Sequence, residues 1–211
     1  MKKIPTYISE KLKISSNIEK QYHYFPKNRA ELEESIHKLL HERGPNADLN
    51  DINTSKITDM LLLFSGVDSK YIENIDISRW DVSHVTDMYG MFRNCKNFNC
   101  DLSRWNVSQV TDMECMFADC ESFNSDISQW DISSCQTTKM MFYKCKSFNQ
   151  DLSQWKPINV ETMEYMFYDC KEFNCDLSKW EDSIKKCKNT SDMFKCCFSM
   201  KKFPDWYMKF I

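Results

Sequence analysis

A 25-residue repeat dominates this sequence and limits the folds that it can adopt. The unit reads D-[IL]-S-x-W-x-[VI]-S-x-V-T-D-M-x-x-M-F-x-x-C-x-x-F-N-x and recurs in register over four copies. A period of this length is the signature of a solenoid, in which each unit completes its core only by stacking on its neighbours. The aligned columns are Trp80, Trp105, Trp130, Trp155 and Trp180; Phe92, Phe117, Phe142 and Phe167; and Cys95, Cys120, Cys145 and Cys170.

The repeat changes at both ends of the array. Ile57-Thr58-Asp59-Met60 precedes its counterpart by 28 residues, and aligning Met163 with Met193 and Phe173 with Phe203 gives an offset of 30 at the other end. Atypical terminal units are expected in a solenoid because each must cover an open end of the core. We therefore predict about six units over 52–206 and a C-terminal aromatic tail over 207–211.

Residues 1–51 lie outside the repeat and predict an N-terminal helical cap. Asn28-Arg29-Ala30-Glu31 has the form of a capping box, and Gly44-Pro45 is a typical stop signal. Between them lies an amphipathic segment whose apolar stripe consists of Leu32, Ile36, Leu39 and Leu40. Residues 1–20 are expected to be either loosely ordered or a short helix.

Each repeat unit predicts one short helix and one short strand. Thr111-Asp112-Met113-Glu114 resembles a capping box, and an apolar stripe at i, i+3, i+4 and i+7 follows it. The alternating segment 123–128 is typical of a strand. The predicted fold class is therefore an α/β solenoid with leucine-rich-repeat geometry, in which Phe, Met and Trp replace Leu. The stripe in this unit consists of Met113, Met116, Phe117 and Cys120.

Composition narrows the possible functions. The chain carries 28 Lys and Arg against 31 Asp and Glu. This near balance excludes nonspecific electrostatic binding to nucleic acid or to an anionic membrane. No run of 18 apolar residues is present, so no membrane span is expected. With 3 glycines, the chain contains no glycine-rich phosphate-binding string, and no nucleophile motif indicates catalysis. We expect a protein that is not an enzyme and uses no cofactor.

The first residues of the sequence and the cysteines indicate where in the cell the protein is expected to reside. The first residues are basic, but no apolar segment of a signal peptide follows them. The 11 cysteines, an odd number, therefore indicate reduced thiols rather than a disulfide scaffold. These features predict a cytoplasmic protein, and the alternative is the cell surface, reached by an unrecognised route.

The string from Asp101 to Met113, followed by Met116-Phe117 and Phe123-Asn124, closely resembles the BspA-like leucine-rich-repeat proteins. The resemblance covers about residues 52–203. It implies a non-enzymatic binding scaffold, often a surface adhesin or lipoprotein. Members also occur in phage- and virus-encoded chains without an export signal. The resemblance thus favours either an intracellular interaction or inhibitor protein from a phage or mobile element, or an adhesin for a host protein or glycan.

Three repeated columns suggest chemistry, and each has a structural alternative. The tryptophans can form a platform for a ligand or can pack one rung on the next, which the near-identity of the copies favours. The acidic column can hold Ca²⁺, or each carboxylate can accept N–H bonds within its own turn. The cysteines lack a C-x-x-C pair and are expected to fill the core rather than bind zinc. Cys196-Cys197, outside the expected register, is the predicted reactive pair. The acidic column is Asp101, Asp126, Asp151 and Asp176.

Positions that vary between copies are the better binding candidates, because packing does not fix them. Two sets of them predict the surface that meets another protein. The alternative for both is an ordinary solvated surface. The sequence leaves the partner's identity and the oligomeric state open. The first set is a mildly basic stripe of Arg79, Arg104, Gln129, Gln154 and Lys179, and the second is Tyr89, Glu114, Lys139 and Glu164.

Overall fold

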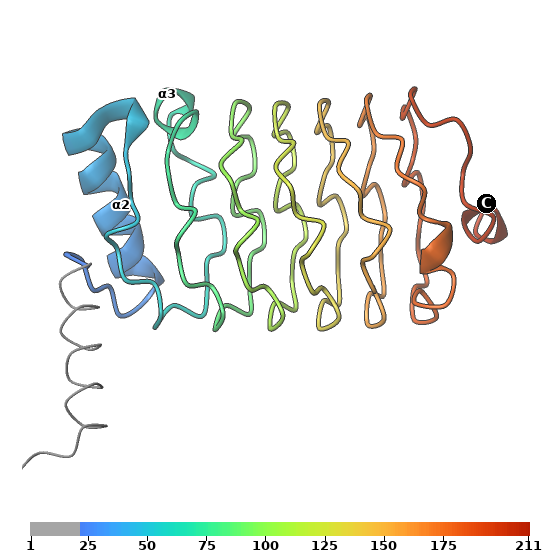
Figure 1. Cartoon of the computed structure of the whole chain (residues 1–211), viewed down its shortest axis with the longest axis horizontal. Coiled ribbons are helices and arrows are strands. Elements are labelled where there is room, and N and C mark those ends of the chain that lie inside the picture. Colours follow the sequence, from blue (N-terminus) through green and yellow to red (C-terminus); the bar gives the residue numbers. More distant parts are fainter. Residues whose placement is uncertain (1–21) are drawn as a thin grey trace, which may run out of the picture.

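The computed structural model of the chain describes residues 22–211. They form a row of similar rungs with one long helix at the N-terminal end of the row (Figure 1). The expectation for residues 1–20 lies outside this range. The helices are α2 (Arg29–Arg43) and the single turn α3 (Ser69–Ile72), with 3-10 turns at Gly44–Asn46, Ser178–Trp180 and Tyr207–Lys209. Within residues 22–211, no helix has the length and apolar character needed to cross a membrane.

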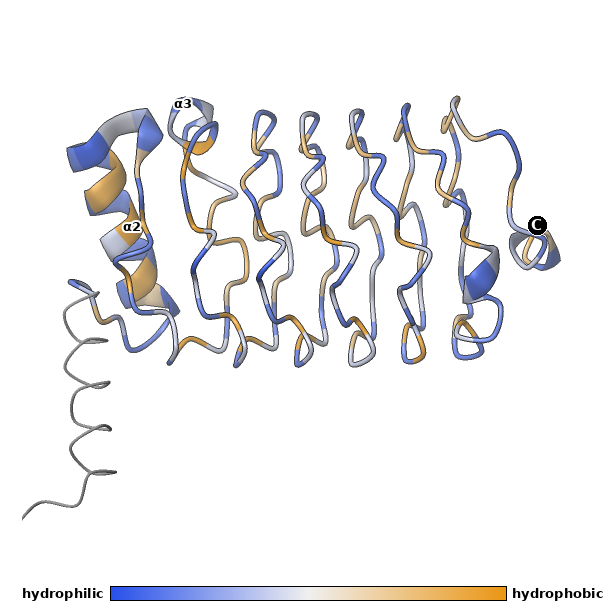
Figure 2. Cartoon of the chain, viewed as in Figure 1, coloured by the Kyte–Doolittle hydropathy of each residue, from blue (hydrophilic) through white to orange (hydrophobic). Residues whose placement is uncertain are grey.

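The predicted cap helix is confirmed. The Asn28 side chain accepts a hydrogen bond from the backbone N–H of Glu31 at 3.0 Å, and the Glu31 carboxylate accepts one from the backbone of Lys27 at 2.9 Å. These bonds satisfy amide groups that a helix start leaves free. The predicted apolar stripe of α2 is buried against the first rung. Figure 2 shows the helix with apolar and polar sides at one end of the row.

The short helix predicted in each unit is wrong. Cys115 and Phe117 donate their backbone N–H groups to Lys139 and Met141 of the next rung, both at 2.9 Å. Met116, between them, donates to Met113 at 3.2 Å, which closes a tight turn. Cys115 has a φ of 57°, a left-handed conformation that ends a right-handed helix. A neighbouring rung thus supplies the acceptors that the helix would have supplied from within.

The predicted capping box in the repeat is wrong for the same reason. Asp112 Oδ1 accepts from the backbone N–H of Glu114 at 2.8 Å, and the hydroxyl of Thr111 donates across to the carbonyl of Thr86 at 3.0 Å. No strand forms over 123–128 either. Rungs instead meet through isolated parallel bridges, such as Asp87 with Asp112. The units are stacked turns with little regular secondary structure.

The core of the stack is a set of aromatic ladders. Phe117 stacks on Phe92 with a centroid distance of 5.5 Å and an angle of 3°, and on Phe142 at 5.8 Å and 7°. Each repeat tryptophan is buried, and Trp155 donates its indole N–H to the carbonyl of Ile127 in the preceding rung at 3.0 Å. The packing role of the tryptophan column is therefore confirmed. Equivalent indole bonds are made by Trp80, Trp105, Trp130, Trp180 and Trp206.

The expected offset of 30 residues at the last unit is wrong. The bridge joins Thr162 to Asn189, an offset of 27, so the insertion is shorter than aligning the aromatic residues indicates. Cys197 thereby enters the cysteine column, and its thiol donates to the carbonyl of Phe167 at 2.9 Å. Cys197 is buried, and burial raises the pKa of its thiol to about 12. Burial disfavours the thiolate of Cys197, which is the reactive form, whereas the neighbouring Cys196 is only half-buried.

Pairing also begins earlier than residue 52. Asp48 forms a parallel bridge with Asp76, and Tyr24 forms one with Ile52. The residues around Asp48 thus continue the stack toward α2, and the segment at Tyr24 adds one more layer. The longer link between the first and second copies contains α3.

Candidate functional site

The basic stripe lies on one corner of the stack, where each unit turns sharply. Its five members are all exposed. The turn before each is held by an aspartate: Asp101 Oδ1 accepts from the backbone N–H of Ser103 at 2.9 Å, which lowers the pKa of that carboxyl. Asp126, Asp151 and Asp176 make the same bond, so the turn interpretation of this column is confirmed. Across residues 22–211, no His, Cys, Asp and Glu side chains gather in threes to hold a metal ion.

The members of the basic stripe are engaged locally to different degrees. Arg79 lies 3.7 Å from Asp48, and Gln129 and Gln154 donate to the hydroxyl of the serine that precedes each. Lys179 lines a shallow hollow of about 350 Å³ together with Cys175. The corner is thus a polar surface with three cations spread over five rungs.

The second predicted set lies on a different surface, which we call the ladder face. It consists of the outward side chains of segments 58–66, 86–94, 111–119, 136–144, 161–169 and 188–196, whose backbones bond from rung to rung. Tyr89, Glu114, Lys139 and Glu164 form one half-buried column on it. Lys139 Nζ lies 2.9 Å from Glu164, and the hydrogen bond to this carboxylate raises the pKa of Lys139.

A hollow of about 370 Å³ opens on the ladder face over the last three rungs. We call it the tyrosine hollow. Tyr143 and Tyr168 stack with a centroid distance of 5.0 Å and an angle of 17°, and Tyr165 meets Tyr168 edge-on at 5.9 Å. Its lining is Lys139, Met140, Tyr143, Tyr165, Tyr168, Asp192 and Lys195.

Only Lys139 of the lining was among the candidates predicted from sequence. The three tyrosines occupy two positions of the unit that hold different residues in other copies: Tyr165 corresponds to Cys115 and Gly90, while Tyr143 and Tyr168 correspond to Ala118. These positions lie off the apolar stripe of the expected helix, and none of the three tyrosines was among the predicted binding residues. The available signal was that they vary between copies, whereas the buried columns do not.

Every cation around the tyrosine hollow is paired with a carboxylate. Lys195 Nζ lies 3.1 Å from Asp192, Lys144 Nζ lies 3.9 Å from Asp119, and Lys139 pairs with Glu164 as above. Two of these cations also sit over ring faces, Lys144 at 4.9 Å from the centroid of Tyr143 and Lys195 at 6.0 Å from that of Tyr168. Paired charges of opposite sign thus surround the aromatic side chains of the hollow.

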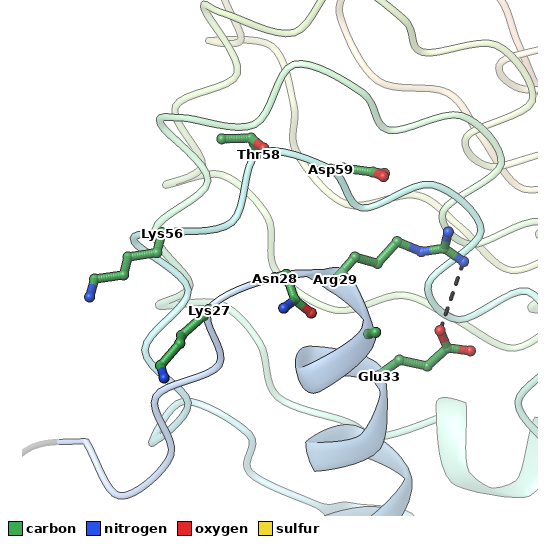
Figure 3. Close-up of a pocket in the computed structure, with 8 residues that line it drawn as sticks. Lys27, Asn28, Arg29, Glu33, Lys56, Thr58 and Asp59 are labelled. Atoms are coloured by element: carbon green, nitrogen blue, oxygen red, sulfur yellow. Dashed lines mark ion pairs between the residues drawn. The ribbon is translucent and has the colours of Figure 1, made fainter.

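A larger hollow, about 440 Å³, lies where α2 meets the first rung (Figure 3). Asn28, at its centre, already caps α2, and Arg29 pairs with Glu33 at 3.8 Å. Lys27 and Lys56 extend away from it to one side in Figure 3. This hollow lies at the joint between cap and stack, where Asn28 bonds within the chain while the buried Nε of Arg29 has no hydrogen-bond partner within residues 22–211.

Comparison with known proteins identifies the repeat as one already grouped into a family. The pattern described as Mycoplasma protein of unknown function, DUF285, matches residues 34–146 and again residues 107–206. Together the two matches span 34–206, well over half of the chain. They include the end of α2 and every rung. No curated protein and no solved structure matches the chain.

Proposed function

The chain belongs to the DUF285 family, and from this premise we propose that it acts as a non-enzymatic scaffold that binds another protein through the face of its repeat stack. The observation that carries the proposal is the contrast between two kinds of position. Buried columns repeat almost unchanged, whereas the outward columns of the ladder face differ from rung to rung.

This contrast is what a binding scaffold requires. The invariant columns supply the core, so changes in the outward positions leave the fold intact. The backbone bonds between rungs hold those outward side chains in a fixed array, which reduces the entropy lost on binding. Aromatic and Met side chains, which are enriched at protein interfaces, are concentrated at one end of this face.

Two finer proposals accompany this one. We propose that the stack is a turn-built relative of the BspA-like leucine-rich repeats, since the 25-residue string from Asp101 carries that pattern. We also propose that the protein works inside the cell as an interaction or inhibitor protein. Fractionation of the source cells tests the second, and recovery of the protein on the outer surface would favour an adhesin.

The function test compares the two predicted surfaces in one capture experiment from the source or host cell. One variant changes all five residues of the basic stripe to Glu. The other carries Tyr89→Ala, Glu114→Lys, Lys139→Glu and Glu164→Lys, which preserves the Lys139–Glu164 pair in reversed order and therefore the rung contacts.

We expect the wild type to retain a defined protein that the ladder-face variant loses and the basic-stripe variant keeps. Loss of the captured protein with the basic-stripe variant alone would place the binding surface at the corner. If folded wild type captures no protein, the scaffold function is contradicted.

A further inference from the structure

We propose that the tyrosine hollow is the anchor site of this binding surface and takes one uncharged aromatic side chain, of the Trp, Tyr or Phe type, from the partner protein. The inference rests on the proposed function and adds to it the chemistry of the contact. It also names the rungs that carry the contact, the fourth to the sixth.

The shape of the hollow matches an aromatic ring. Tyr143 and Tyr168 offer a stacked pair, and the 72° angle between Tyr165 and Tyr168 adds a second wall nearly perpendicular to it. Aromatic rings make favourable edge-to-face contacts as well as stacked ones. Because the faces of Tyr143 and Tyr168 are covered by each other and by Lys144 and Lys195, an inserted ring would make edge-to-face contacts with the rings that line the hollow. Met140 completes the lining with a flexible thioether that makes favourable contacts with rings. A volume of about 370 Å³ is sufficient for one large side chain.

The charges around the hollow disfavour a charged occupant. An incoming cation meets Lys144 and Lys195, which already lie over the faces of Tyr143 and Tyr168. An incoming anion meets Glu164, and also Asp192, each of which is already paired with a lysine. A neutral ring disturbs none of these pairs. The paired charges then form a polar rim that surrounds the apolar anchor, as in the energetic centres of protein interfaces.

The hollow is held in place by the rungs beneath it. Met140 donates its backbone N–H to the carbonyl of Glu164 at 2.9 Å, and Tyr165 donates to Ser191 at 3.0 Å. Both residues have left-handed φ values, 54° and 56°, and both side chains line the hollow. The ring walls are therefore preorganised by backbone geometry, and binding need not order them.

The test uses small probes of each chemistry with the full chain. Indole and 4-methylphenol represent aromatic side chains, n-butylammonium represents lysine, and propionate represents glutamate. NMR of protein labelled at methionine methyls reports binding through Met140. We expect saturable shifts with the two aromatic probes and at least tenfold weaker binding in Tyr168→Ala, with Tyr168→Phe close to wild type. Phe25→Ala, which removes an exposed aromatic side chain outside the ladder face, is the matched control and should bind as wild type does.

Equal or tighter binding of n-butylammonium or propionate would overturn the proposal. So would aromatic binding that Tyr165→Ala and Tyr168→Ala leave unchanged in folded protein. Capture of a partner that persists in these two variants would refute the anchor site while leaving the scaffold function standing. Aromatic-probe binding with no captured partner would instead contradict the scaffold function.

Discussion

The indole ladder offers the sharpest test of how this stack is held together. Trp155 is 2% exposed and donates its Nε1–H to the Ile127 carbonyl one rung earlier. Trp155→Phe removes this donor and shortens the ring. The same carbonyl also accepts the backbone N–H of Trp130 at 3.1 Å, so it keeps one partner after the change. The bond alone is therefore worth about 1 kcal/mol, the low end for a buried group.

The smaller ring contributes the larger part of the expected loss. Phe lacks roughly three carbon-sized groups of Trp, each worth about 0.8 kcal/mol when buried. The total for Trp155→Phe is thus about 3 kcal/mol, with any unfilled space between Phe142 and Trp180 adding to it. Urea unfolding followed by circular dichroism measures this loss, with an unchanged m-value showing that the transition remains comparable.

A benzothienylalanine at position 155 separates the two contributions. It keeps nearly the full ring and lacks the N–H group, so it should cost only the bond, about 1 kcal/mol. A loss below 1 kcal/mol for Trp155→Phe would refute the assigned role of the ladder. Equal losses for the two changes would show that the ring size contributes nothing.

Three further changes test other parts of the fold. Gly90→Ala should destabilise by about 1 kcal/mol or more in urea unfolding, because φ is 55° and an added Cβ would lie 2.6 Å from Leu62 Cδ2; a neutral result would contradict this geometry. Asn28→Ala should cost about 1 kcal/mol and reduce helical circular dichroism by exposing the start of α2; an unchanged spectrum and midpoint would count against the cap. Arg43 holds the pKa of Asp51 below its ordinary 3.8, so this carboxylate stabilises the fold above about pH 3.8 and the effect is lost as the pH falls through the lowered value. Asp51→Asn should therefore be less stable at pH 7 and lose less on acidification, and parallel pH curves for the two proteins would refute the pairing.

Features that depend on local patterns can be predicted from this sequence, and features that depend on contacts between rungs cannot. The period, the buried columns and the start of α2 at Asn28 were predicted, because they depend on patterns within one unit or one helix turn. The strand and helix predicted inside each unit do not form. At Cys115 the apolar spacing fits a helix, but the nearest acceptor for its N–H is Lys139, 24 residues along the chain.

The candidate binding residues divide in the same way. The variation that marked Lys139 as outward is visible in the sequence, and the structure places this residue on the ladder face. The grouping with Tyr143, Tyr165 and Tyr168 is not visible, because the sequence does not show which side chains of successive rungs come into contact. Tyr143 and Tyr168 meet because the backbones of their rungs bond to one another, as Lys144 N–H does to the carbonyl of Tyr168 at 2.7 Å.

The sequence by itself thus determined a stacked repeat with an aromatic core and a helical cap, since hydrophobic positions repeated at a fixed period must be buried together. The tertiary structure decided the path of the chain inside each rung. Each backbone N–H can bond within its own turn or to the next rung, and only the presence of a neighbour selects the second. That selection brings Met140, Tyr143 and Tyr165 of neighbouring rungs together and creates the hollow on the ladder face.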